Sequence, residues 1–190
     1  MPHNIILVGY RGTGKTTVGR LLANRLGRPF ADVDDRIEAV AGRSVADIFA
    51  AEGEAGFRDR EAAALAELCA QSGCVIATGG GAVLREANRR LLAASGFVVW
   101  LTASPDTLWE RLRADPTTAA RRPNLTATGG RAEVTALVAA REPLYREVAD
   151  FVSIGDAPSP DALADAILTA WNGGSTSPPS SGACGSSPPA

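Results

Sequence analysis

Lysine and histidine are nearly absent from this chain of 190 residues, which contains one lysine, Lys15, one histidine, His3, and eighteen arginines. With a single histidine close to the N-terminus, histidine-based catalysis is excluded. The three cysteines, Cys69, Cys74 and Cys184, form no C-x-x-C pair and are odd in number. This argues against a disulfide framework or a zinc site. Any chemistry must therefore use carboxylates, arginines, Lys15 and a bound metal.

Long apolar runs and a strong net charge are lacking as well. No apolar run approaches the roughly 18 residues of a transmembrane helix, and the formal net charge is −2 with 45% hydrophobic residues. Neither a membrane nor nucleic acid is an expected partner. The opening residues, Met-Pro-His-Asn, have no basic region followed by an apolar leader. We therefore expect a soluble globular domain that works in the cytoplasm as a monomer.

The clearest motif is the G-x-x-x-x-G-K-T sequence at residues 9–16, which follows an apolar run at 5–8 and precedes a helical pattern at 18–26. Glycines let the backbone curl so that its N–H groups point at phosphate oxygens, and a helix N-terminus adds partial positive charge. Lys15 reaches the β- and γ-phosphates and the Thr16 hydroxyl can bind Mg²⁺. The expected ATP contacts are Gly12, Thr13, Gly14, Lys15, Thr16 and Thr17.

Two carboxylates follow in a short predicted strand at 30–35. Strand alternation puts Asp32 and Asp34 on one side, near the phosphate loop. In the alternative, Asp34 or Asp35 only caps the following helix. The next predicted strand, at 74–77, ends in Thr-Gly-Gly-Gly and carries no acid, so Asp32 is the best candidate for a metal ligand beside Thr16.

Further candidates come later in the chain. Arg58 is expected in the first turn of a helix, where a cation needs an anionic ligand or an acid such as Glu61. Three glycines, Gly79, Gly80 and Gly81, end the strand at 74–77 and allow a substrate to approach the backbone, although a flexible turn would look the same.

The segment at about 113–130 is polar, contains two prolines and carries Arg121 and Arg122. It has the composition of a mobile lid that could exclude water, and a plain surface loop is the alternative. Pro143 is expected to kink or interrupt the helix that follows. Residues 172–190 are Gly, Ser, Pro and Ala with one cysteine, which predicts a disordered tail after a single domain at 1–171.

Five predicted strands alternate with helices. This pattern favours a three-layer α/β/α sandwich around a mainly parallel sheet, of the type found in nucleoside monophosphate kinases. A GTPase would need N-K-x-D, which a single lysine in the phosphate loop rules out. An ATPase module would normally have an acid where this chain has Thr-Gly-Gly-Gly. A small-molecule kinase is the favoured class.

The combination of motifs resembles the shikimate kinase family up to about residue 171. The segments that carry the resemblance are the phosphate loop, Asp32-Val33-Asp34, Gly53-Glu54, Phe57-Arg58, Glu61, Gly79-Gly80-Gly81, Arg122-Pro123, and Arg141 before Pro143-Leu144-Tyr145. The resemblance implies phosphorylation of the 3-hydroxyl of shikimate by ATP, a step of chorismate and aromatic amino acid biosynthesis.

The resemblance also implies a role for each matching residue. Asp34 would orient the hydroxyl and accept its proton, while Lys15 and Arg122 would neutralise the transferring phosphoryl group. Thr16 and Asp32 would hold Mg²⁺. The shikimate site would comprise Asp34, Arg58, Gly79, Gly80, Gly81 and Arg141. Arg121 competes with Arg122 for the lid role.

Two other functions stay open at this point. A gluconate-type or other sugar-acid kinase would also need arginines for a carboxylate, although the glycine triplet and Asp-Val-Asp favour shikimate. A non-catalytic nucleotide binder would not need Lys15, Asp32 and Asp34 together.

Overall fold

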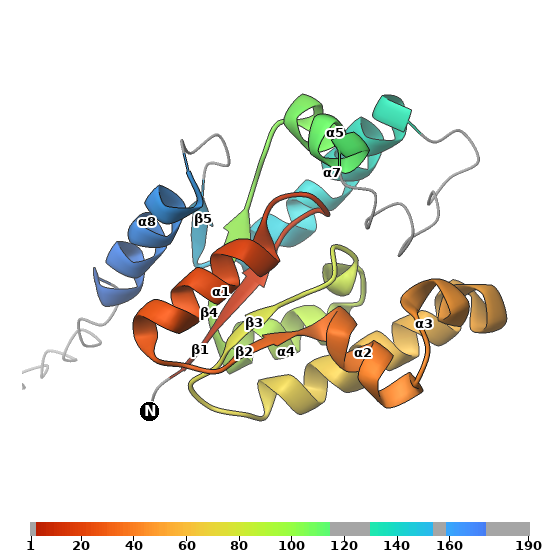
Figure 1. Cartoon of the computed structure of the whole chain (residues 1–190), viewed down its shortest axis with the longest axis horizontal. Coiled ribbons are helices and arrows are strands. Elements are labelled where there is room, and N and C mark those ends of the chain that lie inside the picture. Colours follow the sequence, from red (N-terminus) through yellow and green to blue (C-terminus); the bar gives the residue numbers. More distant parts are fainter. Residues whose placement is uncertain (1–2, 115–129, 154–158, 174–190) are drawn as a thin grey trace, which may run out of the picture.

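The computed structural model describes residues 3–114, 130–153 and 159–173 (Figure 1). The elements in chain order are β1 Asn4–Val8, α1 Lys15–Leu26, β2 Phe30–Asp32, α2 Val33–Ala41, α3 Val45–Cys69, β3 Val75–Ala77, the 3₁₀ helix η1 Ala82–Leu84, α4 Glu86–Ser95, β4 Gly96–Leu101, α5 Pro105–Ala114, α7 Gly130–Val148, β5 Phe151–Ser153 and α8 Pro160–Gly173. The expected lid, with Arg121 and Arg122, lies almost wholly outside the described residues. The predicted domain end at residue 171 is two residues too early, because α8 continues to Gly173. The rest of the predicted tail, from residue 174, lies outside the described residues.

The five strands form one sheet in the order β2-β3-β1-β4-β5, and every pair in it is parallel. The central strand β1 aligns Leu7 with Ala77 of β3, which in turn aligns with Asp32 of β2. The carboxyl ends of these three strands therefore lie at one edge of the sheet. In open parallel sheets this is the edge where ligands bind.

Helices cover both faces of the sheet, as the three-layer prediction requires (Figure 1). Alternation along β1 sends Ile5 and Leu7 into a core with α1 and α8. Ile6 and Val8 point the other way, into a larger core formed with α2, α3, α4 and α7. Every one of these β1 side chains is fully buried, so β1 holds the phosphate loop that follows it on a rigid base.

Local sequence signals explain most helix boundaries. Gly27 ends α1 in a left-handed conformation, and Ser44 forms a capping box with Asp47 at the start of α3. Pro143 was expected to kink or interrupt its helix; an interruption is wrong, because α7 continues through Pro143 to Val148. Proline removes one backbone donor, and Arg141 and Tyr145 hold the helix on both sides of it by bonding to the carbonyl of Gly80.

Among the described helices, none combines the length and apolar character needed to cross a membrane.

Candidate active site

The phosphate loop joins the end of β1 to the start of α1. Gly14 adopts φ 90°, a conformation that favours glycine, and the helix begins at the next residue, Lys15. The Lys15 side chain folds back under the loop, where Nζ donates to the carbonyls of Gly9 and Tyr10 at 2.8 Å each. It also lies 3.4 Å from Thr13 Oγ1. The loop thus holds a nearly buried cation against its own backbone.

The predicted metal ligands are in contact. The Thr16 hydroxyl donates to Asp32 Oδ2 over 2.9 Å, which joins the first turn of α1 to the end of β2. Hydroxyl and carboxylate oxygens are ligands that Mg²⁺ accepts, with the remaining positions filled by nucleotide phosphates and water. Burial raises the pKa of Asp32, and the neighbouring Asp34 charge raises it further. A bound cation would offset both effects, so the pair fits Mg²⁺.

The alternation predicted for Asp32 and Asp34 is wrong in its local geometry. The strand ends at Asp32, whose side chain caps α2 by accepting from the backbone N–H of Asp34 at 3.0 Å. Asp34 therefore lies in the first turn of a helix, not on a strand. The two carboxylates are still close, since, in addition to burial, the charge of Asp34 raises the pKa of Asp32. An aspartate does cap the following helix, as the alternative interpretation expected, but the capping residue is Asp32 and not Asp34 or Asp35.

Arg58 is held by two acids. Nη1 donates to Glu61 Oε2 at 2.7 Å, and Nη2 and Nε donate to Glu54 Oε1 at 3.1 and 3.3 Å. The Glu61 partner considered from the sequence is therefore confirmed. A backbone break at Gly53, with φ 68°, divides α3, so Arg58 lies in the second turn after the break and not in the first. Burial lowers the pKa of Arg58, but Glu61 and Glu54 outweigh this and raise it.

The glycine triplet links this arginine to the phosphate loop. A Cβ on Gly81 would lie 2.3 Å from Arg58 Nη1, and one on Gly80 would lie 3.2 Å from the backbone N of Arg11. Only glycine lets these three segments approach so closely. The third member, Gly79, opens the turn, since its carbonyl accepts from the N–H of Ala82.

Arg141 reaches the same turn from α7. Its Nη1 donates to the carbonyl of Gly80 at 3.2 Å, and the hydroxyl of Tyr145 donates to the same oxygen at 2.5 Å. Burial raises the pKa of Tyr145 to about 12, so the hydroxyl keeps its proton at neutral pH. The structure thus brings Arg58, Arg141, the glycine turn and the phosphate loop together.

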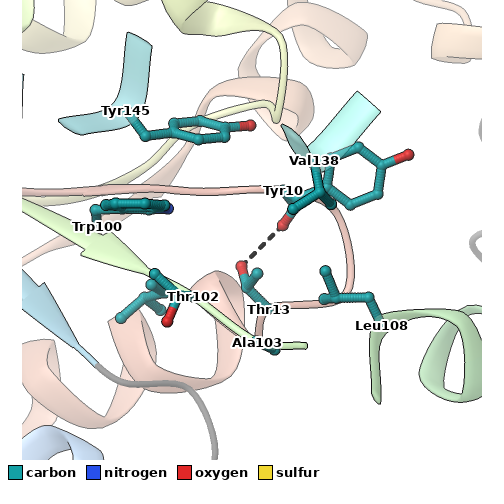
Figure 2. Close-up of a pocket in the computed structure, with 9 residues that line it drawn as sticks. Tyr10, Thr13, Trp100, Thr102, Ala103, Leu108, Val138 and Tyr145 are labelled. Atoms are coloured by element: carbon teal, nitrogen blue, oxygen red, sulfur yellow. Dashed lines mark hydrogen bonds between the residues drawn. The ribbon is translucent and has the colours of Figure 1, made fainter. Parts of the chain in front are cut away.

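Sequence reasoning missed a role for three residues here: Glu133 belongs to no motif, and Tyr10 and Tyr145 entered only as parts of motifs. Tyr10 and Tyr145 line a small cavity of about 20 Å³ behind the loop, where Tyr145 stacks on Trp100 (Figure 2). Such a volume has room for a water molecule. Glu133 is buried on α7 and pairs with Arg11 at 3.5 Å. The i, i+4 spacing of Arg141 and Tyr145 on one helical face was the signal that could have identified Tyr145.

The remaining predicted residues have simpler placements. Gly12 and Thr13 lie within the loop, and Thr13 Oγ1 donates to the Tyr10 carbonyl at 2.8 Å. Thr17 is exposed in the first turn of α1. Arg122 lies outside the described residues.

Comparisons with known proteins agree with this arrangement. The family profile described as "Shikimate kinase" matches residues 11–172. The chain belongs to the shikimate kinase family. A shikimate kinase of Rhodopirellula baltica is 54% identical over 149 residues, which cover 78% of this chain and 80% of the relative. One from Symbiobacterium thermophilum is 57% identical over 146 residues, 77% of this chain and 83% of the relative.

A solved structure of this family supports the fold directly. The shikimate kinase of Acinetobacter baumannii in complex with shikimate has a TM-score of 0.86 and 39% sequence identity, covering 93% of this chain and 97% of that one. The predicted α/β sandwich of the P-loop kinase type is therefore confirmed.

Proposed function

We propose that this protein transfers the γ-phosphoryl group of ATP to the 3-hydroxyl of shikimate, forming shikimate 3-phosphate and ADP. The observation that carries the proposal is the 54% identity to a named shikimate kinase over most of the chain. The glycine turn supports it, since Arg58 lies against Gly81 and Arg141 donates to Gly80. Two guanidinium groups beside one turn suit the carboxylate of a small acid.

The chemistry needs one base and several cations. The 3-hydroxyl oxygen forms a bond to the γ-phosphorus while the bond from that phosphorus to the β,γ-bridging oxygen breaks, releasing ADP. Asp34 orients the hydroxyl and accepts its proton. Asp34 suits this role because it lies two residues after Asp32, at the edge of the sheet where β1 leads into the phosphate loop.

Cations neutralise charge on the transferring group. Lys15 lies inside the phosphate loop and would turn its ammonium from the loop carbonyls toward the phosphates. Arg122 is the proposed lid arginine. Thr16 and Asp32 would hold Mg²⁺, which when bound offsets the negative charge of the β- and γ-phosphates. Gly12, Thr13, Gly14 and Thr17 would complete the ATP contacts.

The acceptor side is assigned to a separate set of residues. Arg58 and Arg141 would bind the shikimate carboxylate while Gly79, Gly80 and Gly81 lie against the ring. We also propose that the protein works as a monomer in the cytoplasm. Light scattering of the purified protein measures its mass in solution, and a dimer would contradict this part.

A coupled ADP-release assay tests the function. The protein is mixed with ATP and Mg²⁺, together with shikimate, with gluconate, or with no acceptor. ADP release that depends on shikimate is expected. Activity with gluconate and not shikimate would instead support a sugar-acid kinase, and no acceptor-dependent release at all would indicate a non-catalytic nucleotide binder.

A further inference from the structure

Arg141 is a buried cation with an unusual set of neighbours. It is 7% exposed, and its hydrogen bonds are to neutral groups, the Gly80 carbonyl and the Tyr145 hydroxyl. Within the described ranges, no acidic side chain pairs with it. Arg58, the other arginine of the turn, differs because Glu61 and Glu54 both bond to it. A buried guanidinium that bonds directly to no acid gains from any further group that stabilises its charge and fixes its position.

The ring of Tyr10 is such a source. The Arg141 guanidinium lies 5.6 Å from the centroid of this ring, within the distance at which the negative face of an aromatic ring attracts a cation. Tyr10 is only 2% exposed and packs against Leu108 and Val134. Figure 2 shows its ring beside Val138 of α7. The ring is therefore held in place by α5 and α7.

Tyr10 is also fixed through its backbone. Its carbonyl accepts from Lys15 Nζ and from Thr13 Oγ1, each at 2.8 Å. A second cation, Arg11, lies 5.7 Å from the same ring, but Arg11 has its own acid in Glu133. Of the two guanidinium groups near this ring, Arg141 is the one with no ion pair among the described residues. Tyr10 thus contacts Lys15 through its backbone carbonyl and Arg141 through its ring.

We propose that Tyr10 is a positioning residue for acceptor binding, whose ring face holds the Arg141 guanidinium in the orientation that receives the substrate carboxylate. This inference rests on the proposed function, in which Arg141 binds the carboxylate of the acceptor. The ring and not the hydroxyl carries the effect, because the buried Tyr10 hydroxyl has no hydrogen-bond partner among the described residues.

The test varies the electron density of the ring at nearly constant shape. Full-length protein is prepared with phenylalanine, monofluorophenylalanine or trifluorophenylalanine at position 10. KM for shikimate and KM for ATP are measured for each variant, with the melting temperature as a check on folding. Fluorine withdraws the negative charge from the ring face and so weakens cation binding.

We expect KM for shikimate to rise stepwise with fluorination, by about 5- to 30-fold from phenylalanine to trifluorophenylalanine. KM for ATP is expected to change less than about twofold, because the loop backbone is unaltered. A KM for shikimate that does not depend on fluorination would overturn the proposal, since a steric role responds only to shape. An equal rise in both KM values would also overturn it.

Trp171→Leu is the matched control. It removes a cation–π pair of similar geometry, in which Arg28 lies 5.3 Å from the Trp171 ring, between the loop after α1 and α8. KM for shikimate should stay within about twofold of wild type, and a rise as large as in the fluorinated series would contradict a specific role of Tyr10. If the wild-type protein phosphorylates gluconate and not shikimate, the proposed function fails, and the same series is read with gluconate.

Discussion

The hydroxyl of Thr16 donates a hydrogen bond to Asp32 Oδ2 over 2.9 Å, which connects the phosphate loop helix to the end of β2. The other oxygen of Asp32 caps α2 by accepting from the Asp34 backbone. One carboxylate therefore orients both the hydroxyl that is proposed to bind Mg²⁺ and the helix that carries the proposed base. Its burial and the nearby Asp34 charge both oppose its ionisation.

Asp32→Asn should stabilise the ligand-free protein and impair the enzyme. The amide removes a partly buried charge that Asp34 repels, and asparagine remains a good helix cap. We expect the melting temperature to rise by about 2 °C or more. With Mg²⁺ and ATP, kcat/KM should fall at least about tenfold, because an amide is a poor Mg²⁺ ligand. Glu110→Gln, at an exposed position of α5, is the control and should change neither value much.

The same carboxylate predicts a pH dependence of stability. The folded-state pKa of Asp32 is raised, so just above the ordinary Asp value the folded protein keeps a proton that the unfolded chain has released. The free energy of unfolding should therefore fall as pH rises through the raised pKa. Urea unfolding from pH 3.5 upward measures this, and Asp32→Asn should lack this part of the slope. An unchanged slope would contradict the assignment.

Asp34→Asn tests the proposed base. An amide of the same shape can orient a hydroxyl but cannot accept its proton, so kcat should fall by about 10²- to 10⁴-fold while KM for shikimate changes little. Steady-state kinetics with shikimate and Mg-ATP measure both. Full activity in this variant would exclude Asp34 as the base.

Lys15→Arg should inactivate the enzyme without unfolding it. The ammonium fits among two carbonyls and a hydroxyl, and a planar guanidinium cannot replace a compact charge in that space. We expect kcat to fall about 100-fold or more. The reverse change on the exposed side of the same helix, Arg20→Lys, should have little effect. A Lys15→Arg enzyme with more than a tenth of wild-type kcat would contradict this role of the loop.

Gly81→Ala should weaken acceptor binding through a steric effect. Gly81 has φ −102° and ψ 0°, which alanine tolerates, but the new Cβ would lie 2.3 Å from Arg58 Nη1. The guanidinium must move from its bonds to Glu61 and Glu54, so KM for shikimate should rise about tenfold or more. Gly173→Ala, with no neighbour within 4 Å of its Cβ, is the matched control. Equal KM values in both variants would show that Arg58 does not need its present position.

Features encoded within a few residues could be predicted from the sequence. The phosphate loop, the Ser44 capping box and the Gly27 helix end all follow from local spacing. The parallel sheet follows from the alternation of strands and helices. The pairing of Thr16 with Asp32 was also predictable, because the carboxyl ends of the strands in one parallel sheet lie at the same edge.

Features that depend on long-range packing could not be predicted. The end of β2 is a local exception: an Asp that ends a strand and an Asp that caps a helix look alike in the sequence, so the predicted strand ran on through Asp35. Pro143 looked like an interruption because the bonds from Arg141 and Tyr145 to Gly80 span more than 60 residues. The contact between Tyr10 and Arg141 brings together residues 131 positions apart that share no motif.

The carbonyl of Gly80, which accepts from both Arg141 and Tyr145, has a consequence for how such a site can evolve. A backbone oxygen is present whatever the codon at position 80 specifies, so mutation there cannot delete the acceptor. Substitutions at this position are limited instead by side-chain volume, since a Cβ would lie 3.2 Å from the backbone N of Arg11. At positions 141 and 145, by contrast, selection acts on the functional groups themselves. The two sides of this hydrogen-bonded contact are therefore under different selection: residue size at position 80, and donor groups at positions 141 and 145.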